Sequence, residues 1–265
     1  TISRSFKNFA RKKKIFHLSM LFISMFRILV TFLVIIIFWY IICLLFELPS
    51  FILPSPDLVA IALFNNFSEI LNHSSITLLE ILLSLFFGIV LGSFFAVLIS
   101  LSERLKRWIM PLLLASQSIP VFALAPILVL WFGYGISSKV IIGTIIVFFP
   151  IASNFSDALN KIPKEYIHAG QTLGFSKLQI FNLIKLPNAL PGLFSGIRVG
   201  ACFAPIGAVV GEWIGGSQGL GSYMIYSNAR LQIDNMFAAL IILIVITISL
   251  YHLIDLILKK LIWWE

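Results

Sequence analysis

The sequence predicts an all-α membrane protein with six transmembrane helices, and three observations lead to that fold class. Hydrophobic residues make up 60% of the 265 residues and charged residues only 11%, and the mean hydropathy is +1.04. Long uncharged runs recur along the chain, and the polar segments between them alternate in Lys and Arg content. The composition excludes a water-soluble fold, because too few polar residues are available to cover its surface.

A basic N-terminal arm, residues 1–27, precedes the membrane domain, which we expect over residues 28–265. The first predicted span, residues 28–46, is uninterrupted and apolar, and it just crosses a hydrocarbon core of about 30 Å. No small-residue cleavage site precedes Glu47, so we expect an uncleaved anchor.

A Leu-Pro-Ser-Pro stretch at residues 53–56 ends that helix. Asp57 can then cap a moderately amphipathic helix that lies in the membrane interface and extends through Asn72. The second span follows over residues 76–100, where charge is again nearly absent.

The third span, residues 108–132, contains Pro111, Pro120 and Pro126, and we expect these prolines to break it. Local unwinding would expose backbone groups that must line a cavity. The fourth span covers residues 140–156.

The polar stretch of residues 157–185 is helix-like but too charged to enter lipid. The fifth and sixth spans follow over residues 189–211 and 236–258. Most of the positive charge lies in the N-terminal arm, in residues 101–107, in this polar stretch and at the C-terminus. Because Lys and Arg concentrate in cytoplasmic loops, we expect these segments and both termini in the cytoplasm of a bacterial inner-membrane protein. The opposite loops hold only Lys139 and Arg230.

Ionisable residues within spans are candidates for function, since each is costly in lipid. We interpret Glu80 as a solvated residue near the outer interface. For Arg198, attraction of an anionic solute and pairing with a carboxylate of another span both stay open. Glu212 is interpreted as an interface anchor, with a solute or gate contact as the alternative. Ser116 and Gln117 in the proline-broken span are further candidates for the translocation pathway.

A motif in residues 164–187 carries the functional hypothesis. A short helix, a turn permitted by glycine and a second short helix would make a compact knob, and we expect a proline to end it where the fifth span begins. Two adjacent small residues would leave a flat patch for close contact with another protein. The positions of the motif are Glu165, His168, Ala169, Gly170, Gly174, Ile184, Leu186 and Pro187.

This motif resembles the EAA loop of binding-protein-dependent ABC importer permeases, which reads Glu-Ala-Ala, three residues, Gly, nine residues, Ile, any residue, Leu-Pro. Gly174 and the Ile-x-Leu-Pro end fall in register, and Ala169 matches the first alanine. His168 stands where the family usually has Glu, and Gly170 where it has the second Ala. Glu165, one helical turn earlier, could substitute for the missing Glu.

The resemblance implies a type I importer permease fold and a cytoplasmic ATPase-coupling loop over residues 157–187. It also implies three partners: a second copy of the permease, a separate ABC ATPase, itself a homodimer, that holds ATP and Mg²⁺, and an extracytoplasmic substrate-binding protein. Three further segments resemble permeases of the taurine, aliphatic sulfonate and nitrate type. The Leu-Pro-Ser-Pro entry, residues 119–135 and residues 211–221 carry that similarity. The last segment favours the branch that imports thiamine-pyrimidine precursors.

Enzyme motifs are missing from the sequence, which contains no GxxxxGK[ST], HExxH or GxSxG pattern. We therefore expect a transport subunit without catalytic residues, a metal site or a cofactor of its own, and without nucleic acid as a partner. The alternatives are an ion-coupled secondary transporter, which would need carboxylates at mid-membrane, and a membrane scaffold protein, which would need no ordered loop motif.

Overall fold

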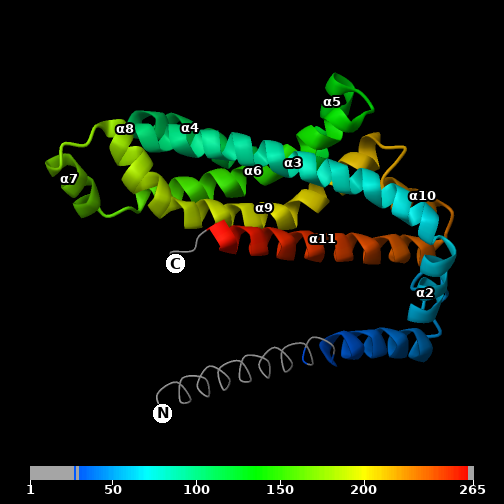
Figure 1. Ribbon diagram of the computed structural model, residues 1–265. Helices are drawn as coiled ribbons and strands as arrows, with labels where there is room; N and C mark the ends of the chain where they lie inside the picture. Colours follow the sequence, from blue (N-terminus) through cyan, green and yellow to red (C-terminus); the bar gives the residue numbers. More distant parts are fainter. Residues whose placement is uncertain (1–26, 28–29, 262–265) are drawn as a thin grey trace, which may run out of the picture.

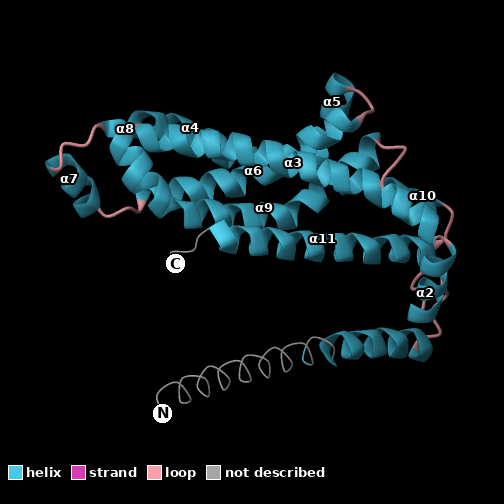
Figure 2. Cartoon of the chain, in the orientation of Figure 1, coloured by secondary structure: helices cyan, strands magenta, loops and turns pink. Residues whose placement is uncertain are grey.

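The structure is a computed structural model that describes residue 27 and residues 30–261. Within that part of the chain all regular structure is helical, which confirms the predicted all-α fold (Figure 2). Four long helices run side by side (Figure 1). They are α3 (Phe67–Leu101), α6 (Ile136–Asn160), α9 (Leu186–Gly215) and α11 (Ile233–Leu261). All four are long and apolar enough to cross a membrane.

A fifth candidate span is the pair α4 (Glu103–Ser118) and α5 (Val121–Phe132), which is bent by 97°. Of the three prolines expected to break this span, only Pro120 lies at the bend, where it precedes α5. Pro111 and Pro126 lie inside their helices. The bend directs α5 away from the long axis of the bundle (Figure 1).

The first predicted span appears as an apolar helix over Val30–Leu45, shorter than the other candidates. Its side chains are almost all exposed, and Trp39 contacts Phe237 of α11 with a ring separation of 5.5 Å. The basic arm of residues 1–27 lies outside the described residues except for Arg27. The count of six spans therefore stays a prediction, compatible with these helices.

The predicted interfacial helix over residues 57–72 is wrong in its extent. A short helix, α2 (Pro56–Asn65), ends at Asn66, and the following residues belong to α3. The Asn66 side-chain amide donates to the carbonyl oxygens of Ala62 and of the Asn235 side chain, at 3.1 and 2.9 Å. This bridge to the start of α11 fixes the break between the two helices.

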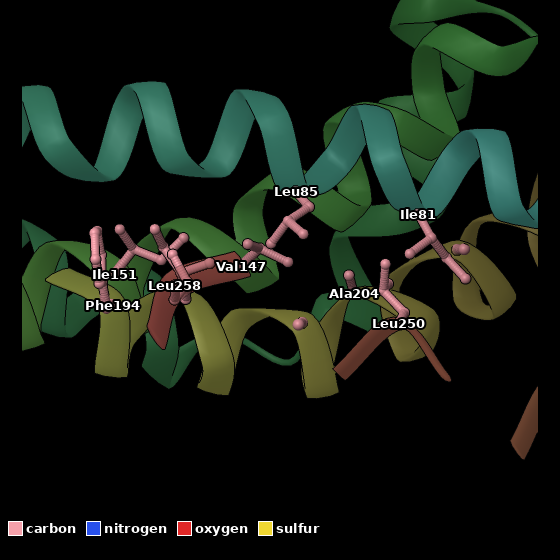
Figure 3. Packing of buried hydrophobic residues seen from close by; sticks show 11 residues of the cluster. Ile81, Leu85, Val147, Ile151, Phe194, Ala204, Leu250 and Leu258 are labelled. Atoms are coloured by element: carbon pink, nitrogen blue, oxygen red, sulfur yellow. The ribbon is translucent and has the colours of Figure 1, made fainter. Parts of the chain in front are cut away.

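The core of the bundle forms where α3 and α9 pack against α6. Ile81, Leu85, Val147, Ile151 and Phe194 belong to one buried cluster, which α11 completes (Figure 3). Glycines allow this close approach. A Cβ atom at Gly196 would lie 2.9 Å from the Cα atom of Ile151. Small residues at such contacts let helices in a membrane gain van der Waals packing.

The two ends of the bundle differ in structure. At one end, α7 (Lys164–Thr172) and α8 (Lys177–Ile180) form a helical hairpin, which we call the hairpin end. At the other, a turn over residues 216–219 and the short helix α10 (Leu220–Ala229) follow α9, and we call this the α10 end (Figure 1). α9 continues through Gly215, past the predicted end of the fifth span at residue 211.

Candidate functional site

The hairpin follows directly from its local sequence. Gly174 has a φ angle of +78°, a conformation that costs side-chain-bearing residues free energy, and it joins α7 to α8. Ser176 then caps α8 through a reciprocal pair of hydrogen bonds. Its Oγ accepts from the Gln179 backbone N–H at 3.3 Å, while its own N–H donates to Gln179 Oε1 at 2.8 Å. The predicted pair of short helices and the glycine turn between them are confirmed.

The sequence predicted that the two small residues of the motif form one flat surface, and this prediction is wrong. Ala169 is exposed, whereas Gly170 is buried against the second half of the hairpin. A Cβ atom at Gly170 would lie 2.7 Å from Ile184 Cδ1 and 3.4 Å from Ile180 Cγ1. Gly170 therefore closes the hairpin internally, and only Ala169 is available for contact with another protein.

Pro187 does not end the second helix. α8 continues through one π-helical turn, η1 (Phe181–Lys185), directly into α9. In that turn the Leu186 N–H donates to the carbonyl of Phe181, five residues earlier. This wider turn relieves the clash that the proline ring would otherwise make with the preceding turn. Leu186 packs partly buried at the base of the bundle.

The hairpin surface carries apolar side chains that nothing in the described chain covers. They are Tyr166, Leu173, Leu178 and Leu183, each more than half exposed. Glu165 and His168 are exposed beside them, and among the described residues Glu165 has no ion-pair partner. An apolar patch rimmed by polar groups is typical of a surface that binds another protein.

Near the α10 end, three charged side chains from three helices are buried together. Lys139 of α6 donates to Glu80 Oε1 of α3 at 2.8 Å and to the Gln218 carbonyl at 3.1 Å. The Glu80 and Lys139 side chains are 0% and 6% exposed. Glu212, near the end of α9, is 1% exposed. We call Glu80, Lys139 and Glu212 the charge cluster.

Glu212 fixes the turn that leads into α10. Its Oε1 accepts from the Thr77 hydroxyl at 2.6 Å, and its Oε2 accepts from the Gly221 backbone N–H at 2.5 Å. The same Thr77 oxygen accepts from the Leu220 N–H at 2.8 Å. Gly219 has a φ angle of +111°, and a Cβ atom there would collide with the Glu212 carboxylate. The turn is therefore built around this buried carboxylate.

Three interpretations from the sequence are wrong at this end. Glu80 is not solvated, and Lys139 is not an outer-loop charge, since the two neutralise each other inside the bundle. Glu212 is not an interface anchor either. A signal was present in the sequence: His73, Thr77 and Glu80 recur at helical spacing, which places them on one face of α3. Their partners are 59 or more positions away in the chain.

Arg198, the deepest predicted charge, pairs with a carboxylate of another span, which was one of the two interpretations left open. Its Nε lies 2.7 Å from Asp255 Oδ1 of α11. The second oxygen of Asp255 contacts Lys259 at 2.7 Å. Arg198 therefore joins α9 to α11.

Ser116 and Gln117 line a pocket of about 350 Å³ at the bend between α4 and α5. Pro150 of α6 and Phe203 of α9 also line it. The pocket therefore lies at the bend beside Pro120, whereas Pro111 and Pro126 cause no such break, and a role of Ser116 and Gln117 in the translocation pathway stays a prediction. In the described part of the chain, no group of three or more His, Cys, Asp or Glu residues is placed to hold a metal ion.

A helical bundle with several membrane-length helices, buried charge and an exposed hairpin has the architecture of a multi-pass transport subunit. The profile described as "Binding-protein-dependent transport system inner membrane component" matches residues 88–262. The chain is 44% identical to a probable ABC transporter permease protein of Haemophilus influenzae, over 87% of this chain and 94% of that protein. It thus belongs to the family of inner-membrane permease components of binding-protein-dependent ABC importers.

Two further relatives carry names that specify a solute. The formylaminopyrimidine transport permease protein ThiX of Halalkalibacterium halodurans is 38% identical, over 80% of this chain and 85% of its own length. The riboflavin transport system permease protein RibX of Chloroflexus aurantiacus is 36% identical, over 89% of each chain.

Among solved structures, a chain of the MetNI methionine ABC transporter superposes with a TM-score of 0.61 at 24% identity, covering 70% of this chain and 92% of that one. This similarity shows the fold. It confirms that the bundle is of the kind found in ABC importer permeases.

Proposed function

We propose that this permease moves a small solute, delivered by an extracytoplasmic binding protein, and that the α7–α8 hairpin couples transport to a separate ABC ATPase. The observation that carries the proposal is the exposed apolar surface of the hairpin, held on a rigid glycine turn and continuous with α9 through η1. A movement of the hairpin is therefore passed to a membrane-length helix without an intervening loop.

The ATPase, as a homodimer, would hold ATP and Mg²⁺, and this chain would supply no catalytic group. Glu165, His168 and Ala169 would form the contact surface, whereas Gly170, Gly174, Ile184, Leu186 and Pro187 would shape the hairpin and its connection to α9. A second copy of the permease would complete the pathway. Ser116 and Gln117 are the pathway residues that this structure favours, because Arg198 and Glu212 are engaged within the chain.

The first choice of solute is a thiamine-pyrimidine precursor, because a relative named as a formylaminopyrimidine permease shares 38% identity. A sulfonate such as taurine, or nitrate, is the second candidate, on the resemblance of the sequence motifs. An ion-coupled carrier would also contain buried charge such as Glu80 and Lys139, and the family membership decides against it.

Ala169→Glu tests the coupling role, because it adds a charge to the contact surface without altering the fold of the hairpin. In proteoliposomes that contain all subunits, we expect uptake and the stimulation of ATPase activity by loaded binding protein to disappear together. Lys177→Ala, a change on the same hairpin, is the matched control and should keep both activities. Normal coupling in Ala169→Glu would contradict the proposal.

The orientation can be tested separately. We propose that the hairpin and both termini lie in the cytoplasm and the α10 end outside. Single cysteines at Ser176 and Ser217, both exposed, report the two ends. A membrane-impermeant thiol reagent added outside should label the Ser217 position and not the Ser176 position, and the reverse pattern would invert the topology.

A further inference from the structure

The α10 end contains a polar pocket of about 470 Å³. It lies between the start of α3, the end of α9, the following turn and α10. This volume falls within the range of sites for small molecules, about 300–1,000 Å³. The side chains that line it include Glu69, His73, Trp213, Ser217, Tyr223 and Tyr226.

The pocket differs from two other cavities of the described chain. A cavity of about 510 Å³ between α3 and α6 and one of about 380 Å³ beside α9 are lined mainly by aliphatic and aromatic side chains. Lipid can fill such apolar grooves in a membrane protein. The polar pocket instead combines aromatic rings with carboxylate, imidazole and hydroxyl groups, which lipid chains cannot satisfy.

The wall of the pocket is held rigidly. The charge cluster fixes the turn, as described above, and the Gly219 N–H donates to His73 Nδ1 at 3.0 Å. Because Nδ1 accepts this hydrogen bond, the His73 ring carries its proton on Nε2, and this N–H group can donate to a ligand. The His73 ring also packs against Tyr223, with a centroid separation of 5.3 Å. Rigid walls reduce the entropy lost on binding.

The charge of the pocket favours some solutes over others. Glu69, which is exposed, and Glu212 line it, but both carboxylate oxygens of Glu212 already accept hydrogen bonds within the chain. Lys139 is paired with Glu80 inside the bundle, whereas the Arg230 guanidinium lies 4.0 Å from the centre of the Tyr226 ring, beside the pocket. The Glu69 carboxylate would repel an anion that binds beside it, and it offers an acceptor to a donor group of the solute.

Trp213, which is 42% exposed, offers a flat apolar face at the pocket. Tyr226 is 55% exposed, and one face of its ring is covered by the Arg230 guanidinium. Such rings bind planar partners by stacking, and a neighbouring carboxylate accepts hydrogen bonds from ring or amino N–H groups. Flat shape, N–H donors and the absence of negative charge therefore describe the complementary ligand.

We propose that this pocket is a binding site of the permease itself for a small, planar nitrogen heterocycle that bears N–H donors and no negative charge. The proposal rests on the proposed function for the direction in which solute arrives. It deepens that function, because it favours an aminopyrimidine over a sulfonate or nitrate.

Direct binding tests the site apart from transport. The purified permease–ATPase complex, without binding protein, is dialysed to equilibrium against radiolabelled formylaminopyrimidine and, separately, against taurine. We expect saturable binding of formylaminopyrimidine alone. Ser217→Trp should fill the pocket and weaken this binding at least about tenfold, while Ser217→Ala, the matched control, should keep it.

A second pair of variants separates recognition from anchoring in the membrane. Trp213→Leu and Tyr226→Leu remove the rings but stay apolar, and each should weaken binding by roughly threefold to tenfold. If both variants change only the thermal stability, the rings are interface anchors and the proposal is overturned. Saturable binding of taurine in place of formylaminopyrimidine would also overturn it.

Uptake by the complete reconstituted importer distinguishes a failure of the site from a failure of the proposed function. In Ser217→Trp we expect a raised KM for formylaminopyrimidine, with ATPase stimulation by loaded binding protein retained within about twofold. Loss of that stimulation would show that this face only docks the binding protein, and the site would be rejected. If the wild-type complex shows no ATP-driven uptake at all, the proposed function fails, and the dialysis result still decides the site.

Discussion

The two ends of the bundle place their polar and apolar groups in opposite ways. The hairpin end exposes large apolar side chains such as Leu173 and Leu178 and closes internally on Gly170. The α10 end buries the ionisable side chains of Glu80, Lys139 and Glu212 and provides most of their hydrogen-bond partners within the chain. The α10 end thus provides partners for its buried polar groups, whereas the hairpin end leaves an apolar surface that a partner protein can cover.

This difference indicates how stability and coupling are divided. A change at the charge cluster should act on folding, because the groups involved have no access to water. A change on the hairpin surface should act on partner contact and leave the bundle intact. The predictions below test that division, from the largest expected effect on stability to the smallest.

Removal of one member of the buried ion pair should have the largest effect. Lys139→Met leaves the buried Glu80 side chain without its ion-pair partner, which we expect to cost about 3–5 kcal/mol of the free energy of unfolding. Denaturant unfolding of the purified permease in detergent measures this cost.

The matched control replaces both partners. Lys139→Met combined with Glu80→Met removes the pair without leaving a lone charge, and it should restore most of the stability. If the double variant is as unstable as Lys139→Met alone, packing rather than charge accounts for the effect.

Two glycines with positive φ angles provide the next test, one from each end. Gly174→Ala at the hairpin meets open space, so only backbone strain of about 1–2 kcal/mol is expected, local to the hairpin. Gly219→Ala adds a collision with the Glu212 carboxylate to a similar strain. The midpoint of thermal unfolding should therefore fall clearly in Gly219→Ala and little in Gly174→Ala, and equal shifts would contradict the division between the ends.

A larger side chain at the hairpin turn should separate coupling from stability. Gly174→Val forces a β-branched residue into the left-handed region and tilts the hairpin, so ATP-driven uptake should fall sharply in reconstituted importer. The amount of permease in the membrane and its unfolding midpoint should change little. Loss of the folded protein in place of coupling would show that the hairpin is part of the folding core.

The smallest effect is expected at the partly exposed ion pairs of α11. Lys259 is 67% exposed where it contacts Asp255, one helical turn earlier. Lys259→Ala should cost at most about 0.5 kcal/mol, because solvent screens such pairs. Arg198→Leu, whose side chain is 25% exposed and joins two helices, should cost more, and unfolding curves of the two variants give the comparison.

Much of the architecture could be predicted because it depends on local properties. Apolar runs longer than the bilayer requires give membrane helices whatever surrounds them, and α3, α6, α9 and α11 each contain a predicted span. The turn at Gly174 was predictable for a similar reason, since a glycine between two short helical segments points to a positive φ angle. The pocket beside Ser116 lies at the bend next to Pro120, one of the three prolines expected to break its span.

The helix boundaries that were predicted wrongly depend on the conformation and contacts of other residues. Asn66 ends α2 because its side chain reaches Asn235, which lies 169 positions away in the sequence. Pro187 continues a helix because the preceding turn widens into η1. Neither outcome could be predicted from the type of the residue at the boundary alone.

A helical membrane protein with a permease-type hairpin could be predicted from the residues alone, because hydropathy and turn chemistry act over a few residues. The positions of its buried charges depend on the folded arrangement of the helices. The sequence around Glu80 and around Lys139 predicted an exposed position for each. They are stable inside the bundle because α3 and α6 place Lys139 Nζ 2.8 Å from Glu80 Oε1. A buried charge requires its partner, and the chain brings that partner close only when it folds.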